Sequence, residues 1–345
     1  MQCFGVFDCA AGRLREIDFS IMDGMARSYG DIRIFTGSSC LDLSEEIGRY
    51  LNVPLSPREI IQFPNENLFV RLLTSVRGQD VFLIQTLTTP VNYHIMELLI
   101  LLDTVKRANA GRVTAVMPYY AYGRSDKKDQ PRVPITARLL ANLISTAGAG
   151  RFLTLDLHAG QIQGFFDIPG DEVSTFHLLS DYFLMKDLHS QPGGAVVVTV
   201  DLGYAKKGRN FAVALGLPIA FIEKRRTGND AKAQSLTVIG EVEGKTIILV
   251  DDEVDTAGSI KGAVDILRVS GAGDIYVCFT HAILSPPAVD RLRSLPIKEI
   301  VTTNSVPIPP ERRLPNMTVL SVAPLLGEVI SRIHNGTSVG QMFNE

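Results

Sequence analysis

Short, almost wholly apolar segments alternate with helical patterns along most of this chain, and that alternation constrains the fold more than any other feature. β-branched residues dominate nine such segments, at 32–37, 80–86, 112–118, 151–157, 195–201, 219–224, 246–252, 274–281 and 299–304. Helical patterns separate them, at 40–52, 91–109, 134–147, 205–215, 258–270 and 285–294. Strands that are apolar on both faces are typical of parallel sheets covered by helices on both sides. The sequence therefore predicts an α/β fold.

The length of the chain and a recurring passage predict two related halves. A chain of 345 residues is long enough for about two domains. The order helix end, small residues, strand recurs at 107–116, 145–155 and 268–277, which favours a duplication. We expect two similar three-layer α/β/α domains with mainly parallel sheets. Their expected ranges are 31–175 and 176–345, after an N-terminal extension over 1–30, with the last residues packing back on the N-terminal domain.

Composition narrows the class of protein. Apolar residues make up 46% of the chain and charged residues 21%, as in ordinary globular proteins, and the net charge is −3. This charge argues against a protein that mainly binds nucleic acid or an anionic membrane. The most apolar stretch, 95–105, is too short to span a bilayer, and charged residues within 1–30 argue against a signal peptide. We expect a soluble, cytoplasmic protein with no nucleic-acid or membrane partner. Its four cysteines form no CxxC pair and are expected to be reduced.

The segment LVDDEVDTAGS, residues 249–259, places acids beside a potential phosphate site. Asp251 and Asp252 end an apolar strand, and small residues then begin a helix, where backbone N–H groups suit a phosphate. The carboxylates would repel phosphate, but they can accept hydrogen bonds from the hydroxyls of a sugar. A ribose 5-phosphate presents both groups. The alternatives are a calcium loop, whose spacing is absent, and a solvated turn with helix-capping aspartates.

Three further clusters follow predicted strands. The segment YGRSDKKDQPR (122–132) carries four cations and suits a polyphosphate, although a solvated loop would look the same. His158 follows the strand at 151–157. If that strand continues, Asp156 lies on the same side as His158, and the pair could orient Mg²⁺; otherwise the histidine is structural. EKRR (223–226) precedes a stretch rich in small polar residues, which indicates a mobile loop able to close over a reacting phosphate.

Together these motifs resemble the ribose-phosphate diphosphokinase family, which shares the type I phosphoribosyltransferase-like fold. DDEVDTAGS resembles the phosphoribosyl-diphosphate motif common to both groups. The resemblance to the diphosphokinases alone extends over 75–86, 96–129, 134–144, 155–169, 221–226 and 332–343. LDLHAGQIQGFFDIP, at 155–169, is the most specific of these stretches. A plain phosphoribosyltransferase would not need the matches at 96–169 and 221–226.

The resemblance implies that the chain transfers the diphosphoryl group of Mg-ATP to the 1-hydroxyl of ribose 5-phosphate. The products would be 5-phosphoribosyl 1-diphosphate, for nucleotide biosynthesis, and AMP. It implies catalytic roles for Lys224, Arg226 and His158, and Mg²⁺ as cofactor, held by His158 and Asp201. The residues implied for ATP are Phe63, Asn65, Asn67, Arg124, Ser125 and Asp126. Those implied for ribose 5-phosphate are Asp201, Asp251, Asp252, Asp255, Thr256, Ala257, Gly258 and Ser259. The family also forms homo-oligomers, commonly hexamers built from dimers.

Three ligand-contacting positions depart from the family pattern. Asn67 stands where a carboxylate is usual, and Ser125 replaces a glutamine. Tyr204 replaces a glycine on the loop that carries Asp201, where the backbone could need to pass close to the ligand or adopt a positive φ. Such departures would suit a non-catalytic or weakly active regulatory member of the family, which is the alternative to an active enzyme. The intact His158 and 251–259 loop favour the enzyme.

Overall fold

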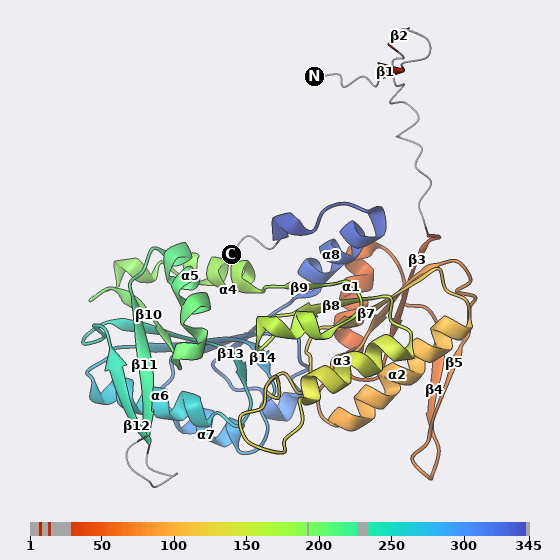
Figure 1. Cartoon of the computed structure of the whole chain (residues 1–345). Coiled ribbons are helices and arrows are strands. Elements are labelled where there is room, and N and C mark those ends of the chain that lie inside the picture. The colour runs from red at the N-terminus through yellow and green to blue at the C-terminus, as the bar shows by residue number, and fades with distance from the viewer. Residues whose placement is uncertain (1–6, 9–12, 15–28, 192, 227–233, 343–345) are drawn as a thin grey trace.

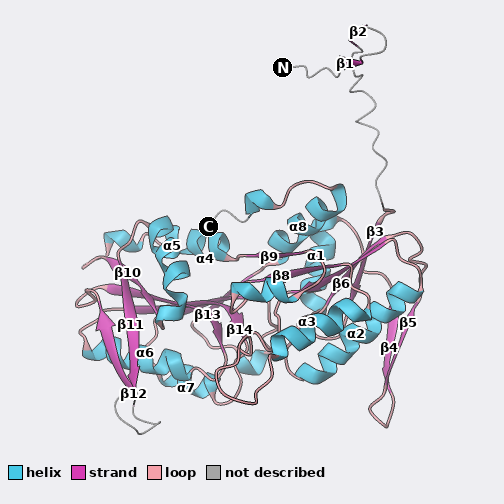
Figure 2. Ribbon diagram, in the orientation of Figure 1, coloured by secondary structure: helices cyan, strands magenta, loops and turns pink. Residues whose placement is uncertain are grey.

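The computed structural model describes residues 7–8, 13–14, 29–191, 193–226 and 234–342, and its two large sheets lie side by side (Figure 1). Each is sandwiched between helices, as the ribbon coloured by secondary structure shows (Figure 2). Within the extension over 1–30, a short bridge pairs β1 (Phe7–Asp8) with β2 (Arg13–Leu14).

The N-terminal sheet has five strands, all parallel, in the order β3-β6-β7-β8-β9. Its strands are β3 (Ile32–Thr36), β6 (Asp80–Ile84), β7 (Arg112–Met117), β8 (Arg151–Leu155) and β9 (Gly170–Val173). One face packs on α2 (Val91–Arg107) and α3 (Thr136–Ala147), and the other on α1 (Leu41–Leu51) and α8 (Ala323–Asn335). Side chains of one strand alternate between these cores, as Leu83 and Ile84 do, because successive strand residues point to opposite faces.

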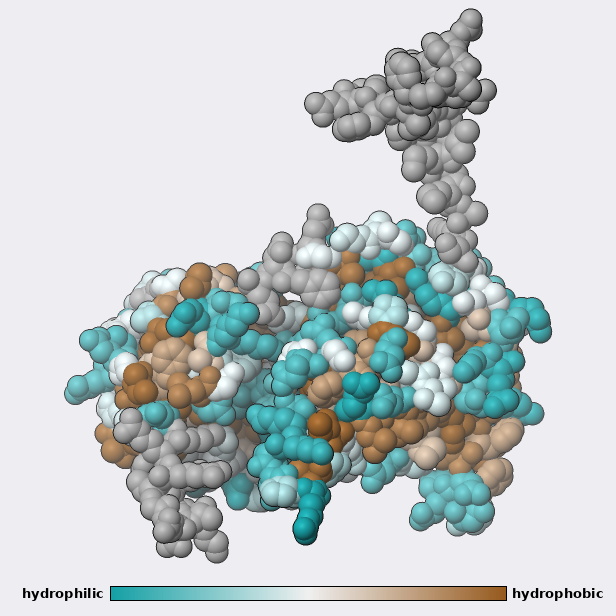
Figure 3. Space-filling model, in the orientation of Figure 1, coloured by the Kyte–Doolittle hydropathy of each residue, from teal (hydrophilic) through white to brown (hydrophobic). Residues whose placement is uncertain are grey.

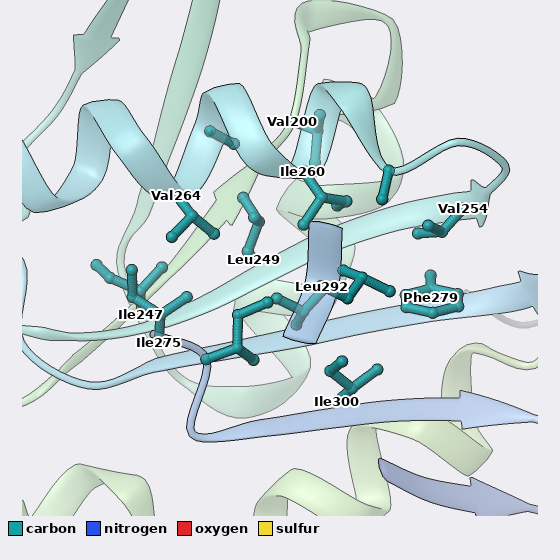
Figure 4. Close-up of a cluster of buried hydrophobic side chains, with 14 of the residues drawn as sticks. Val200, Ile247, Leu249, Val254, Ile260, Val264, Ile275, Phe279, Leu292 and Ile300 are labelled. Atoms are coloured by element: carbon teal, nitrogen blue, oxygen red, sulfur yellow. The ribbon is translucent and has the colours of Figure 1, made fainter. Parts of the chain in front are cut away.

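The C-terminal sheet has seven strands in the order β12-β11-β10-β13-β14-β15-β16, of which only β12 is antiparallel to its neighbour. Its strands are β10 (Ala195–Thr199), β11 (Ile219–Arg226), β12 (Gln234–Ile239), β13 (Thr246–Val254), β14 (Ile275–Ala282), β15 (Glu299–Thr303) and β16 (Met317–Leu320). Helices α6 (Gly258–Val269) and α7 (Ala288–Ser294) cover one face. Figure 4 shows Ile260 and Val264 of α6 above Leu249 of β13. The opposite face packs on α4 (Phe176–Leu184) and α5 (Ala205–Leu215).

The two sheets repeat one strand order. The run β3-β6-β7-β8-β9 in the first corresponds to β10-β13-β14-β15-β16 in the second, and each half carries a hairpin before its second central strand. In the N-terminal half this hairpin is β4 (Arg58–Gln62) and β5 (Leu68–Leu72), a separate two-stranded sheet; in the C-terminal half it is β11 and β12. The prediction of two similar α/β domains with mainly parallel sheets is confirmed.

All six predicted helices are present, but seven strands and the α-helices α4 and α8 were not predicted. The strands are β1, β2, β4, β5, β9, β12 and β16. The last five are outer or hairpin strands, and most of their described residues are partly exposed, so they lack the continuous apolar run that marks a central strand.

The last helix of the chain belongs to the first sheet. α8 packs on α1, and Leu326 and Ile330 join the core beneath Ile34. A buried ion cluster adds to this packing: His334 Nδ1 lies 2.8 Å from a carboxylate oxygen of Asp80, which also pairs with Arg112. The division of the chain at residue 175 stays a prediction. Among the described helices, none combines the length and hydropathy needed to cross a membrane.

Candidate active site

The candidate residues gather where the carboxyl ends of β7 and β8 face the loop after β13. In open α/β sheets ligands bind at this end of the strands, because the loops there are free to vary on a rigid scaffold. The loop between β7 and α3 carries hydrophilic residues near the middle of the face shown in Figure 3. The N-terminal half contributes cations and a histidine, and the C-terminal half contributes the acids.

His158 and Asp252 come together from different halves of the chain. His158 Nδ1 lies 2.7 Å from Asp252 Oδ2, although 94 residues separate them in sequence. The hydrogen bond that His158 donates to Asp252 raises the pKa of His158. Burial alone would raise the pKa of Asp252, but the hydrogen bond and charge of His158 lower it. The pair is therefore an ion pair when His158 is protonated, and it fixes Nδ1 as the ring nitrogen that faces the carboxylate.

Arg124 makes a second link between the halves. Its Nε pairs with Glu253, which is 6% exposed, and its Nη1 lies 4.0 Å from Asp255 Oδ2. Arg124 and both acids line an open pocket of about 280 Å³, together with Thr88, Tyr119 and others from the two halves. Arg124 is 54% exposed at its side chain, so it remains accessible to a ligand. The sequence marked Glu253 as an acid of the loop but gave it no role.

Asp251 and Asp201 lie together on the C-terminal half. Burial raises the pKa of Asp251 well above its usual range, and the charges of Asp252 and Asp201 add to this shift. Asp201 Oδ1 accepts hydrogen bonds from the backbone N–H of Gly203, at 2.9 Å, and of Tyr204, at 3.3 Å. A cluster of carboxylates that destabilise one another suits a ligand that supplies hydrogen-bond donors or positive charge.

The remaining loop residues form the start of α6. Ala257 has a left-handed backbone, with φ 57°, and is followed by Gly258, the first residue of the helix. Arg291 of α7 donates a hydrogen bond from Nη1 to the carbonyl of Thr256, at 2.8 Å. Asp255, Thr256 and Ser259 surround this turn, so the structure has the helix N-terminus that the sequence predicted for an anion.

The expected pairing of Asp156 with His158 is wrong. β8 ends at Leu155, and Asp156 itself has φ 34°, so the alternation of a strand no longer places the two side chains on one side. Asp156 is 4% exposed, and its carboxylate accepts hydrogen bonds from Ser174, Thr175 and Thr280. Asp156 therefore stabilises the junction between the two sheets and does not lie beside His158 as a ligand.

Tyr204 does not need the backbone freedom of glycine. Its φ is −92°, an ordinary value for any residue. Its ring lines a cavity of about 20 Å³ together with Asp156, Asp251 and Lys207, and burial raises the pKa of its hydroxyl well above the usual range. The expected need for a positive φ is thus wrong at this position, and the substitution leaves the turn that carries Asp201 unstrained.

Two residues expected at the nucleotide site make contacts of their own. The Ser125 hydroxyl accepts a hydrogen bond from the backbone N–H of Thr136, at 3.2 Å, at the start of α3. Asp126 is 8% exposed and accepts a hydrogen bond from Gln161. Both contacts fix the loop that carries Arg124 against the N-terminal half.

Three other nucleotide candidates lie apart from Arg124. Phe63, Asn65 and Asn67 form the turn of the β4–β5 hairpin, which projects from the N-terminal half in Figure 1. Phe63 is 46% exposed, and none of the three lines the pocket of Arg124. Within one chain, therefore, the structure does not bring this turn to the other candidates.

The structure describes the backbone of Lys224 and Arg226 but not their side chains. Both belong to β11, in register with Leu236 and Gln234 of β12. The strand thus continues past residue 224, where the sequence predicted its end. Residues 227–233, part of the expected loop, lie outside the described residues.

The expected Mg²⁺ site has suitable donors. With His158 Nδ1 engaged by Asp252, Nε2 is the nitrogen that can bind a metal ion, a common arrangement for a ligating histidine. The carboxylate of Asp201 interacts with Asp251, which adjoins Asp252. Among the described residues, no three His, Cys, Asp or Glu side chains form a complete metal site. A cation held here would complete its shell with oxygens of water or substrate, as Mg²⁺ usually does.

Fold and site define a two-domain α/β protein of the phosphoribosyltransferase-like class. Residues 32–148 match the family model described as the N-terminal domain of ribose phosphate pyrophosphokinase, and residues 229–344 match the phosphoribosyl synthetase-associated domain. Two similar proteins are named ribose-phosphate pyrophosphokinase. The one from Nostoc sp. is 50% identical, covering 90% of this chain and 93% of its own length. The one from Clostridium acetobutylicum is 48% identical, covering 91% and 98%.

A solved structure agrees with these matches. The crystal structure of phosphoribosylpyrophosphate synthetase from Mycobacterium smegmatis superposes with a TM-score of 0.84 at 41% identity, covering 89% of this chain and all of that one. The chain belongs to the ribose-phosphate pyrophosphokinase family. The expected family and enzyme class are therefore confirmed, and the comparisons support the enzyme over its regulatory alternative.

Proposed function

We propose that this chain carries out the reaction of its family at the junction of the two sheets. The diphosphoryl group of Mg-ATP passes to the 1-hydroxyl of ribose 5-phosphate, giving 5-phosphoribosyl 1-diphosphate and AMP. One observation carries the proposal. The acidic segment at residues 251–259, here called the sugar loop, directly contacts the basic side chains of His158 and Arg124 in the opposite half.

The C-terminal half binds the sugar phosphate in this proposal. Asp251 accepts hydrogen bonds from the ribose hydroxyls, and a ligand hydroxyl relieves the crowding of carboxylates around it. Asp252 takes part through the oxygen that does not face His158. The turn from Asp255 to Ser259 holds the 5-phosphate through backbone N–H groups and hydroxyls, aided by the partial positive charge at the start of α6.

The N-terminal half binds ATP. Arg124 contacts the nucleotide from the loop that Ser125 and Asp126 hold in place, and Phe63 stacks on the adenine with Asn65 and Asn67 beside it. Since Phe63 lies apart from Arg124 in one chain, the hairpin would serve a site on a neighbouring copy. We therefore propose a homo-oligomer in which hairpins are exchanged, built from dimers and reaching a hexamer.

Catalysis rests on position and on charge. The 1-hydroxyl attacks the β-phosphorus in line and loses its proton to solvent, and AMP leaves with the electrons of the broken P–O bond. Mg²⁺, held by His158 and Asp201, would neutralise charge on the phosphates. Lys224 and Arg226 belong to β11, and we assign their charges to the stabilisation of the charge that develops on the transferred group. We place the enzyme in the cytoplasm.

Product formation tests this function. Purified protein is incubated with Mg-ATP and ribose 5-phosphate, AMP is measured, and a phosphoribosyltransferase with its base reports the second product. We expect both products in equal amounts. Absence of AMP at high protein concentration would contradict the catalytic proposal and favour the regulatory alternative. Sedimentation of the same sample, with and without nucleotide, tests the oligomer.

A further inference from the structure

Glu253 belongs to the sugar loop, yet its carboxylate contacts Arg124, the residue proposed to bind the nucleotide. It follows Asp252 on β13 and is 6% exposed, and its carboxylate pairs with Nε of Arg124 from the opposite half. The β-ladder to β14 holds its backbone, in register with His281. A nearly buried carboxylate on a rigid strand is a fixed anchor, whereas Arg124, on a loop and 54% exposed, is not.

A carboxylate bound at Nε orients a guanidinium and leaves its other N–H donors available. Arginine has five N–H donors in one plane, so a partner at Nε fixes that plane while terminal N–H groups stay available. In Arg124 the Nη1 atom is 4.0 Å from Asp255, and the residue lines the 280 Å³ pocket between the halves. Glu253 can therefore set the direction in which Arg124 presents its remaining donors.

Tyr119 fixes the other side of Glu253. Burial raises the pKa of the Tyr119 hydroxyl, and the charge of Glu253 and a hydrogen bond to it add to the shift. Tyr119 follows β7 and lines the same pocket. The carboxylate is thus held between a phenol and a guanidinium, both from the N-terminal half, and has little freedom to reorient.

We propose that Glu253 is a positioning residue for the nucleotide: from within the sugar loop it holds the Arg124 guanidinium toward the interdomain pocket. The inference rests on the nucleotide-binding role proposed above for Arg124. It assigns the loop two targets, since Asp251 and the turn at 255–259 serve the sugar phosphate while Glu253 serves ATP. Loss of Glu253 should therefore weaken ATP binding, although the residue belongs to the sugar loop.

Steady-state kinetics of Glu253→Gln test the inference. The amide keeps the shape and an acceptor for Tyr119 but removes the charge that orients Arg124. We expect KM for ATP to rise about tenfold, the effect of losing one charge-assisted hydrogen bond, with KM for ribose 5-phosphate unchanged. Glu253→Asp, which keeps the charge, should recover part of this loss. The control is Glu241→Gln, an exposed acid of the same half paired with Lys245, which should match the unaltered enzyme.

A merely structural role would give a different pattern, because disturbing the loop raises KM for ribose 5-phosphate. That outcome, or an unchanged KM for ATP, overturns the inference. A double-mutant cycle with Arg124→Lys separates it from the proposed function. If Arg124→Lys raises KM for ATP, the double variant should be no worse than Arg124→Lys alone, and additive losses overturn the inference. If Arg124→Lys leaves KM for ATP unchanged, the nucleotide role of Arg124 is wrong, and the inference falls with it.

Discussion

The segments at the carboxyl ends of β6 and β13 differ in chemistry, although these two strands occupy corresponding places in the two sheets. After β6 the chain continues as residues 85–90, Gln-Thr-Leu-Thr-Thr-Pro, without an ionisable side chain, and Thr86 is buried and donates to the carbonyl of Ser305. In the corresponding segment, the end of β13 carries Asp251, Asp252 and Glu253, and Asp255 follows it. The comparison teaches that the two halves share a backbone scaffold, whereas the ionisable groups at this edge of the sheet belong to one copy alone.

The two hairpins also occupy corresponding places in the two halves but differ in chemistry. β11 and β12 extend the C-terminal sheet and carry Lys224, whereas β4 and β5 form a separate sheet that carries Phe63. A cation suits a developing phosphate charge, and an exposed aromatic ring suits a base. We therefore expect the C-terminal hairpin to control turnover and the N-terminal hairpin to control affinity for the nucleotide.

The largest effect expected is that of Lys224→Ala. Removing a cation that acts on the transition state should lower kcat at least about a hundredfold, roughly 2.7 kcal/mol, with little change in KM for ATP. Lys261→Ala, on the exposed side of α6, is the matched control and should keep full activity. Equal losses in turnover and in nucleotide affinity would contradict the division between the hairpins.

Asp251→Asn tests the contrast between the two loops. Weakening the hydrogen bonds to the ribose hydroxyls should raise KM for ribose 5-phosphate about thirtyfold, equivalent to about 2 kcal/mol. Thr86→Val in the corresponding loop should lower the free energy of unfolding by about 1 kcal/mol and leave that KM unchanged. A similar rise in KM for both variants would show that the neutral loop also binds substrate.

Phe63→Ala should raise KM for ATP about tenfold, the loss of one stacking contact, and change kcat less. Ile61→Ala, on β4 of the same hairpin and 42% exposed, controls for a general change in the hairpin. Mixing the Phe63→Ala and Lys224→Ala proteins gives a sharper measurement. If hairpins serve neighbouring copies, mixed oligomers contain sites with both residues intact, and activity exceeds the sum of the separate samples.

The smallest effect concerns the pH dependence of the link between the halves. The raised pKa of His158 means that its contribution to stability is full below the unfolded value of 6.5 and is lost as pH rises through the folded pKa. The lowered pKa of Asp252 means that its contribution is present above 3.8 and is lost as pH falls further. With EDTA present, His158→Gln should therefore lower the free energy of unfolding most near pH 5, by up to about 1 kcal/mol, because the histidine is partly exposed. A loss that is the same from pH 5 to pH 9 would exclude the ion pair.

Central elements of this fold could be predicted from sequence, and peripheral ones could not. β13 could be predicted because Ile247, Ile248 and Leu249 form a continuous apolar run. The structure buries all three, as expected of a strand covered on both faces. β4 and β16 expose much of their surface, and no periodic pattern separates them from loops. The sugar loop was recognisable in the sequence because an apolar strand, acidic residues and small residues follow one another there. The contacts of Glu253 with Arg124, and of Asp156 with Thr280, join distant parts of the chain, so no local pattern could reveal them.

The placement of α8 also affects how the chain is made. The first sheet needs this helix, beside α1, to complete the cover of one of its faces, yet the helix follows the whole second sheet in the sequence. On a ribosome, the nascent N-terminal half exposes the part of that face not covered by α1 while the second sheet is translated. A transcript cut short before codon 323 would yield a chain whose first sheet stays open and available to chaperones or proteases. Completion of the first sheet is thus coupled to translation of the second.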